Sequence, residues 1–171
     1  MRQRIVGAIA ISCSPRLLIA DEPTTSLDLT IQAQYLSLLS DLQKRYHLAL
    51  IFITHNLGIV AKMCDKVAVM YAGRMVESGP VRQIFNRPAH PYTQALLGSI
   101  PRMGDGRERL TAIEGQPPDL AAPPPGCAFH PRCPQVMDRC REQAPPETVL
   151  APRHTTRCWL SVPAPEPATV R

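Results

Sequence analysis

Three side chains that can handle protons and phosphate charge follow two short apolar runs in this sequence. Asp21 and Glu22 come directly after residues 17–20, and His55 follows the run at residues 48–53. Adjacent carboxylates suit a magnesium nucleotide site, because one can orient Mg²⁺ through its waters and the next can activate a water. A histidine at a neighbouring strand end can reach a phosphate or transition-state charge. The competing interpretation is a solvated acidic turn beside a helix-capping histidine.

A sheet is needed to bring these residues together. The pattern predicts strands at residues 17–20, 48–53 and 66–71, and a hairpin that continues to residue 77. Helices are expected at residues 2–13, at 56–63, and between the first two strands, where Ser26 or Asp28 is the expected cap.

Strands alternating with helices are typical of an α/β fold with a mostly parallel sheet whose strands are buried on both faces. Ligands lie off the carboxyl ends of such strands, so Asp21, Glu22 and His55 are expected to meet at one edge.

Residues 17–28 (LLIADEPTTSLD) resemble the Walker B strand and D-loop of an ABC-transporter ATPase, and Thr54-His55 resembles the H-loop of that family. Residues 1–4 resemble the stretch directly after its signature motif. The resemblance implies a P-loop NTPase fold with ATP and Mg²⁺ as ligands. It further implies that Asp21 binds Mg²⁺ through water and that Glu22 is the general base. Asp28 would couple the two sites of an ATPase dimer, and His55 would contact the γ-phosphate.

Other motifs of that family are missing. The sequence contains no Gly-x-x-x-x-Gly-Lys-Ser/Thr loop, which would hold the phosphates through backbone amides and a lysine. The Q-loop and the Ser-Gly-Gly of the signature are missing as well. We therefore expect a truncated chain, real or from a misplaced start, that is inactive by itself. A sheet without its first strands is expected to leave an edge and apolar helix faces uncovered.

The second half of the sequence narrows the resemblance. Residues 84–97, which contain His90-Pro91-Tyr92-Thr93, resemble the His-Pro-Tyr-Thr segment of oligopeptide/dipeptide importer ATPases. Residues 126–134 and 115–118 resemble their C-terminal extension. The resemblance implies an importer of peptides or, less often, of nickel or related small solutes. It implies transmembrane permease subunits and a second ABC ATPase subunit as partners, with a solute-binding protein involved indirectly.

Four cysteines in this region have metal-ligand character. Cys127, Cys133, Cys140 and Cys158 are spaced C-x5-C-x6-C-x17-C. Fourteen of the 19 prolines lie beyond residue 100, and metal binding can supply folding free energy that so irregular a segment lacks. The spacing is longer than that usual for structural zinc, which favours an iron–sulfur cluster, and the resemblance to some relatives implies a [4Fe–4S] cluster. Free thiols remain an alternative, and His130 is a substitute ligand if the metal is zinc.

These observations predict three segments. Residues 1–83 are the C-terminal half of an ABC ATPase domain, residues 84–160 are a proline-rich extension with the four cysteines, and residues 161–171 are a disordered tail. The nine arginines and eight acids beyond residue 100 are mixed, so no nucleic-acid partner is expected despite the net charge of +5. No apolar run is long enough to cross a membrane, which predicts a peripheral protein on the cytoplasmic face.

Two alternatives stay open. In the first, the chain is a fragment that does not hydrolyse ATP and acts as a metal-binding or interaction module through its cysteines. A DNA-repair or chromosome-maintenance ATPase would share the Walker B and D-loop pattern, but it would not explain His-Pro-Tyr-Thr or the four cysteines.

Overall fold

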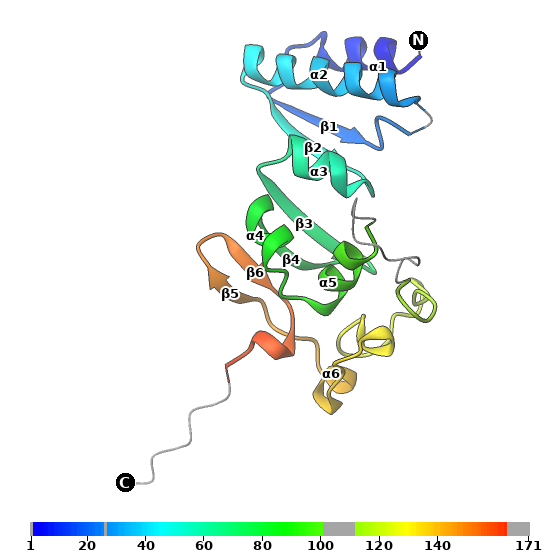
Figure 1. Ribbon diagram of the computed structural model, residues 1–171, viewed down its shortest axis with the longest axis vertical. Helices are drawn as coiled ribbons and strands as arrows, with labels where there is room; N and C mark the ends of the chain where they lie inside the picture. Colours follow the sequence, from blue (N-terminus) through cyan, green and yellow to red (C-terminus); the bar gives the residue numbers. More distant parts are fainter. Residues whose placement is uncertain (1, 26, 101–111, 164–171) are drawn as a thin grey trace, which may run out of the picture. The chain divides into compact units, whose positions relative to one another are not determined.

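The computed structural model describes residues 2–25, 27–100 and 112–163 (Figure 1). The chain divides into two compact units, Met1–Cys64 and Asp65–Arg171, which we call unit 1 and unit 2 and describe separately. Ser26, one of the two expected helix caps, lies outside the described residues. In the part of the chain that is described, no helix is both long and apolar enough to span a bilayer.

Unit 1 contains a two-stranded parallel sheet and three helices. The elements are α1 (Arg2–Ile11), β1 (Leu17–Asp21), α2 (Leu29–Tyr46), β2 (Ala49–Ile53) and α3 (Leu57–Met63). β1 and β2 pair in register from Leu17↔Ala49 to Asp21↔Ile53, with α2 as the crossover between them (Figure 1). The predicted order of strand and helix is therefore confirmed in this unit, and both strands end at the same edge of the sheet.

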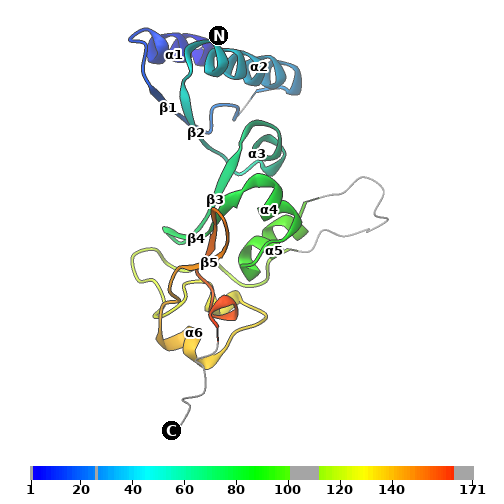
Figure 2. The ribbon, with the colours of Figure 1, turned by 90° about the vertical axis from the view of Figure 1, so that its left-hand side faces the viewer.

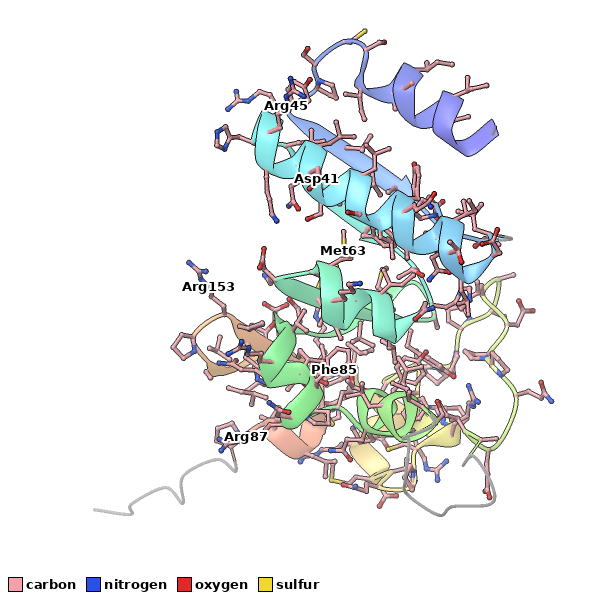
Figure 3. The ribbon with its side chains drawn as sticks, turned by 45° about the horizontal axis from the view of Figure 1, so that its top comes forward. Asp41, Arg45, Met63, Phe85, Arg87 and Arg153 are labelled. Atoms are coloured by element: carbon pink, nitrogen blue, oxygen red, sulfur yellow. The ribbon has the colours of Figure 1, made fainter. Side chains whose placement is uncertain are left out.

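α2 shows how local sequence fixes the crossover. The side chain of Asp28 accepts a hydrogen bond from Ile31 N at 2.9 Å and begins the helix, which confirms this residue as a cap. His47, at φ 50°, ends it. Tyr35 and Leu39 are buried as the helical spacing predicts, whereas Asp41 and Arg45 project outward (Figure 3). The amphipathic pattern therefore identifies the packed face of α2.

Large apolar surfaces of unit 1 lack cover. On α1, Val6 and Ile9 are 64% and 67% exposed, and on the strands Ile19 is 59% exposed. The prediction of strands buried on both faces is therefore wrong for this chain as it stands. The uncovered apolar faces expected for a sheet that lacks further strands are confirmed.

Unit 2 is built on an antiparallel sheet. Its strands are β3 (Lys66–Tyr71), β4 (Arg74–Pro80), β5 (Thr148–Ala151) and β6 (His154–Thr156), in the order β3-β4-β6-β5. Figure 1 labels all four strands, and Figure 2 shows β3, β4 and β5 from the side. The helices are α4 (Val81–Asn86), α5 (Pro91–Gly98) and α6 (Asp138–Glu142), with 3₁₀ turns at His130–Arg132 and Trp159–Ser161.

The predicted third strand of the parallel sheet, residues 66–71, is thus β3 of a separate sheet. It pairs with its hairpin neighbour, and β6 from late in the sequence extends the same sheet. The alternation of strands and helices along the chain predicted that residues 66–71 join the parallel sheet. They pair instead with the next strand of their own hairpin, which is the nearer partner along the chain. The fold is mixed α/β.

The core of unit 2 joins the hairpin to the cysteine-containing segment. Phe129, only 1% exposed, packs against Tyr71 and Tyr92 with ring centroids at 5.1 and 5.3 Å. Val69, Val76 and Ile84 belong to the same buried cluster. Residues on both sides of residue 83 therefore share one core. The predicted boundary there stays a prediction about family organisation, since the division seen in the structure lies between Cys64 and Asp65.

Candidate functional site

The strand ends of unit 1 bring a carboxylate and an imidazole together. Nδ1 of His55 lies 2.6 Å from Oε1 of Glu22, and the backbone N–H of His55 donates to the same oxygen at 3.1 Å. The hydroxyl of Thr25 donates to the other oxygen, Oε2, at 3.0 Å. Because a carboxylate accepts, Nδ1 carries the proton and Nε2 is the ring nitrogen left for another partner. The predicted meeting of Glu22 and His55 at one edge is confirmed as geometry.

The environment keeps Glu22 ionised. The hydrogen bond from the His55 side chain lowers the pKa of Glu22 below its usual value. Glu22 also has φ 43°, a left-handed conformation that is rare for a residue type other than Gly, Asn or Asp. Such strain concentrates at functional sites, and here it turns the carboxylate from the end of β1 toward His55. The sequence gives no sign of this backbone conformation.

The other two predicted site residues of unit 1, Asp21 and Asp28, occupy different positions. Asp21 is the last residue of β1, where it pairs in register with Ile53. Asp28 serves as the N-cap of α2. The structure thus places Asp21 next to the Glu22–His55 pair along the chain, and it gives Asp28 a local role in beginning the crossover helix.

All four cysteines of unit 2 line one small cavity, which we call the cysteine cavity. It is lined by Cys127, Cys133, Cys140 and Cys158, with Trp159 at its wall. Cys127 N donates to Cys140 O at 2.9 Å, so two of the four are tied together through the backbone. Convergence of cysteines that are far apart in the sequence is what the metal-ligand interpretation requires.

Burial favours the protonated form of three of these thiols. Desolvation raises the pKa of Cys127 and Cys133, and it raises that of Cys158 to about 11. All four cysteines are unpaired thiols. Among the described residues, no three His, Cys, Asp or Glu side chains are arranged to hold a metal ion as they stand. Metal binding would therefore require the thiols to lose protons and to draw closer around the metal.

Two histidines line the same cavity. His130 Nδ1 lies 3.0 Å from the carbonyl oxygen of Cys127, which can only accept, so Nδ1 carries the proton. His90 is the N-cap of α5, where its Nδ1 accepts from Tyr92 N at 3.0 Å. His90 therefore orients the turn that leads into Pro91 and α5. Burial lowers the pKa of His90 to about 4, so the ring is neutral at ordinary pH.

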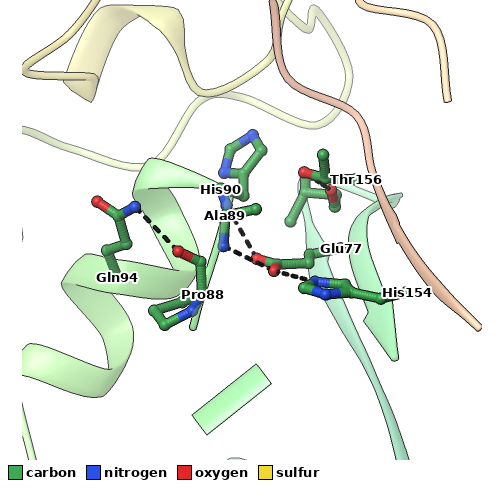
Figure 4. A network of polar contacts seen from close by, with 8 residues as sticks. Glu77, Pro88, Ala89, His90, Gln94, His154 and Thr156 are labelled. Atoms are coloured by element: carbon green, nitrogen blue, oxygen red, sulfur yellow. Dashed lines mark hydrogen bonds and ion pairs between the residues drawn. The ribbon is translucent and has the colours of Figure 1, made fainter. Parts of the chain in front are cut away.

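A buried carboxylate, which sequence reasoning missed, fixes the His-Pro-Tyr-Thr turn. Glu77 on β4 is 1% exposed and accepts hydrogen bonds from Ala89 N at 2.8 Å and His90 N at 3.0 Å (Figure 4). Nε2 of His154, on β6, lies 2.8 Å from the same carboxylate. Glu77 thus joins a strand, the start of α5 and the last strand. Nothing in the sequence marks it, since an acid in a hairpin usually faces solvent.

Comparison with known proteins gives a consistent result. Residues 76–140 match the family described as the oligopeptide/dipeptide transporter, C-terminal region. The dipeptide transport ATP-binding protein DppD of Bacillus subtilis is 54% identical over 160 residues, 94% of this chain and 48% of that protein. The oligopeptide transport ATP-binding protein OppD of Salmonella typhimurium is 50% identical over 163 residues, 95% of this chain and 48% of that protein. The chain is similar to the ATP-binding proteins of dipeptide and oligopeptide transport.

The resemblance predicted from the motifs is thereby confirmed. The chain spans about half the length of the curated relatives it matches. A solved structure of a metal-chelate type ABC transporter in an inward-facing conformation aligns with a TM-score of 0.48 and 31% identity, over 56% of this chain and 36% of that one. The matched family region begins within β4 and ends at Cys140, so it contains the His-Pro-Tyr-Thr turn and three of the four cysteines.

Proposed function

We propose that this chain is the C-terminal part of the energy-coupling ATPase subunit of an ABC importer for dipeptides or oligopeptides. The observation that carries the proposal is the Glu22–His55 pair at the carboxyl ends of parallel strands, in a relative of peptide-transport ATP-binding proteins. The Walker B, D-loop and H-loop roles of the residues, and the P-loop NTPase character of the β1–β2 sheet, belong to this proposal.

In the proposed reaction, Glu22 orients the attacking water and takes its proton. The lowered pKa of Glu22 keeps the carboxylate available as an acceptor. His55 holds that carboxylate through Nδ1–H. It would contact the γ-phosphate through Nε2, which must also carry a proton in order to donate to a phosphate oxygen. Asp21 would orient Mg²⁺ through its waters, and the ion when bound would neutralise phosphate charge.

The proposed partners follow from the same role. A second ATPase subunit would complete the site across a dimer, with Asp28 coupling the two sites. Transmembrane permease subunits would hold the protein at the cytoplasmic face, and a solute-binding protein would act through them. The uncovered apolar surfaces on α1 and β1 are consistent with packing against further protein in the whole subunit.

The catalytic proposal predicts a large effect of Glu22→Gln. The test joins this chain to the N-terminal half of the Bacillus subtilis DppD relative, which the family pattern expects to carry the phosphate-binding loop. Steady-state ATP hydrolysis by the joined protein is then measured. Glu22→Gln is expected to lower kcat about 10²–10⁴-fold, the usual contribution of general-base catalysis. Asp41→Asn, which changes an exposed acid of α2, should leave kcat within about twofold. An active Glu22→Gln protein would refute the assignment.

A second function is favoured by the cysteine cavity. We infer that Cys127, Cys133, Cys140 and Cys158 hold a metal group, and that a [4Fe–4S] cluster suits them better than one zinc ion. Four thiols around one cavity are the donor set of such a cluster, and each would bind a different corner. A cluster therefore accepts thiolates that are farther apart than those sharing a single ion. This role would be the activity of the chain if it were a non-hydrolytic metal-binding fragment.

The metal proposal predicts a visible difference between two cysteine variants. After anaerobic reconstitution with iron and sulfide, the chain is expected to be brown and to contain about four iron atoms, as expected for one four-iron cluster. Cys133→Ser should lose most of the iron and the colour. Cys13→Ser, at an exposed thiol of unit 1, should retain both. A colourless chain with stoichiometric zinc, or equal iron in both variants, would rule out the cluster.

A further inference from the structure

One ring nitrogen of His90 is engaged and the other is not. The backbone N–H of Tyr92 donates to Nδ1, so the lone pair of Nδ1 is occupied and the neutral ring carries its proton on Nε2. Nε2 is buried, and it has no hydrogen-bond partner in the described part of the chain. His90 as a whole is only 1% exposed. A buried N–H without an acceptor costs about 1–3 kcal/mol, so this donor calls for a partner.

The surroundings of His90 indicate which partner fits. The ring lies on the side of the turn away from Glu77, which binds the backbone of the same residue (Figure 4). His90 lines the cysteine cavity, together with all four cysteines and Phe129. Phe129 offers no strong acceptor. His130 and Gln135 also line the cavity, but neither accepts from Nε2 of His90, which has no partner in the described residues. Thiolate sulfurs formed on metal binding are acceptors, so loading the cavity would supply the one that Nε2–H lacks.

The second histidine of the cavity has the opposite tautomer. Nδ1–H of His130 donates to the carbonyl of Cys127, which leaves Nε2 with a lone pair. A metal-binding histidine characteristically donates its other ring N–H to such an acceptor. His90 cannot bind a metal through Nε2 while Nδ1 accepts from Tyr92 N. The two histidines thus differ in what they offer the cavity: His130 offers a lone pair on Nε2, and His90 offers an N–H.

We propose that Nε2–H of His90 donates a hydrogen bond to a sulfur of the metal group held by the four cysteines, and that His90 is a positioning residue of this site and not one of its ligands. The inference rests on the proposed metal role of the cysteines. This role gives the His-Pro-Tyr-Thr turn a function. Glu77 holds the backbone of His90 in place, and the Nε2–H of the ring stabilises negative charge on the sulfur. A hydrogen bond to sulfur stabilises the more negative, reduced form of a cluster.

The test begins with the wild-type chain free of metal. Long-range proton–nitrogen NMR correlations distinguish the two tautomers of each histidine. We expect Nε2–H for His90 and Nδ1–H for His130. An Nδ1–H tautomer at His90 would overturn the inference whether or not metal binds, and this measurement needs no variant to fold.

The second measurement uses His90→Asn after reconstitution with iron and sulfide. Asparagine retains an oxygen that can accept from Tyr92 N at the helix cap, but it is too short to place an N–H where Nε2 lies. Iron content is expected to equal that of the wild type. The ratio of reduced to oxidised cluster at a fixed potential should fall about tenfold, a shift of about 59 mV to more negative potential for one electron.

The outcomes separate the two proposals. Full iron with an unchanged midpoint potential in His90→Asn would overturn the donor role and leave the metal site standing. A wild-type chain that takes up no iron would overturn the metal site, and the donor role with it. Full iron with the negative shift supports both.

Discussion

Replacing Glu77 by alanine is expected to destabilise unit 2 by about 3–5 kcal/mol, the upper range for a single change that breaks a buried hydrogen-bond network. The carboxylate accepts two backbone N–H bonds and one from His154, and its side chain is fully buried. Without it, three donors lose their acceptor in the interior, and each unpaired donor costs about 1–3 kcal/mol. The strand β4, the turn before α5 and the strand β6 would lose their common anchor.

Thermal unfolding followed by the fluorescence of Trp159, the only tryptophan, measures this loss in unit 2. A midpoint at least about 10 °C lower is expected for Glu77→Ala, since 1 kcal/mol corresponds to about 4–8 °C in a unit of this size. Glu147→Ala is the matched control, because it breaks a half-exposed ion pair with Arg157 whose atoms are 3.4 Å apart. Such pairs contribute about 0–1 kcal/mol. Equal midpoints for the two variants would contradict the anchoring role of Glu77.

The sequence predicted the elements of unit 1 well because local rules decide them. Asp28 and the spacing of Tyr35 and Leu39 determine α2, and each strand is a short apolar run closed by polar residues. The parallel register brings the ends of both strands, with Glu22 and His55, to one edge. The left-handed backbone of Glu22 could not be predicted, since it depends on bonds to residues more than thirty positions away.

Unit 2 was harder to predict, because long-range pairing decides it. β6 pairs with β4 although the two strands are far apart in the sequence. The three residues of β6 form no pattern from which that partner could be predicted. The four cysteines were found from their residue type, and their convergence was expected from chemistry alone. Glu77 was missed because its partners, Ala89, His90 and His154, are recognised only once the strands and the turn are packed.

Gly126 links backbone geometry to the proposed metal site, and Gly126→Ala is the second change with a large expected effect. Gly126 has φ 71°, a conformation that strains any residue with a Cβ. A Cβ placed there would lie 2.4 Å from the carbonyl oxygen of Cys140, which is backbone and cannot swing away. That same oxygen accepts from Cys127 N, so the glycine is what lets two of the proposed ligands approach.

The expected cost of Gly126→Ala is about 2–4 kcal/mol, the range for a strained conformation combined with a steric clash. Iron retained after reconstitution should fall with it, because the clash separates Cys127 from Cys140. Gly98→Ala is the matched control: Gly98 ends α5 with open space around it, and alanine there should be neutral or stabilising by up to about 1 kcal/mol. The midpoint temperature and the iron content are measured for both variants, to show whether stability and iron binding fall together in Gly126→Ala alone. If Gly126→Ala lost stability but bound iron like the wild type, the Cys127–Cys140 approach would be a folding feature without a role in metal binding.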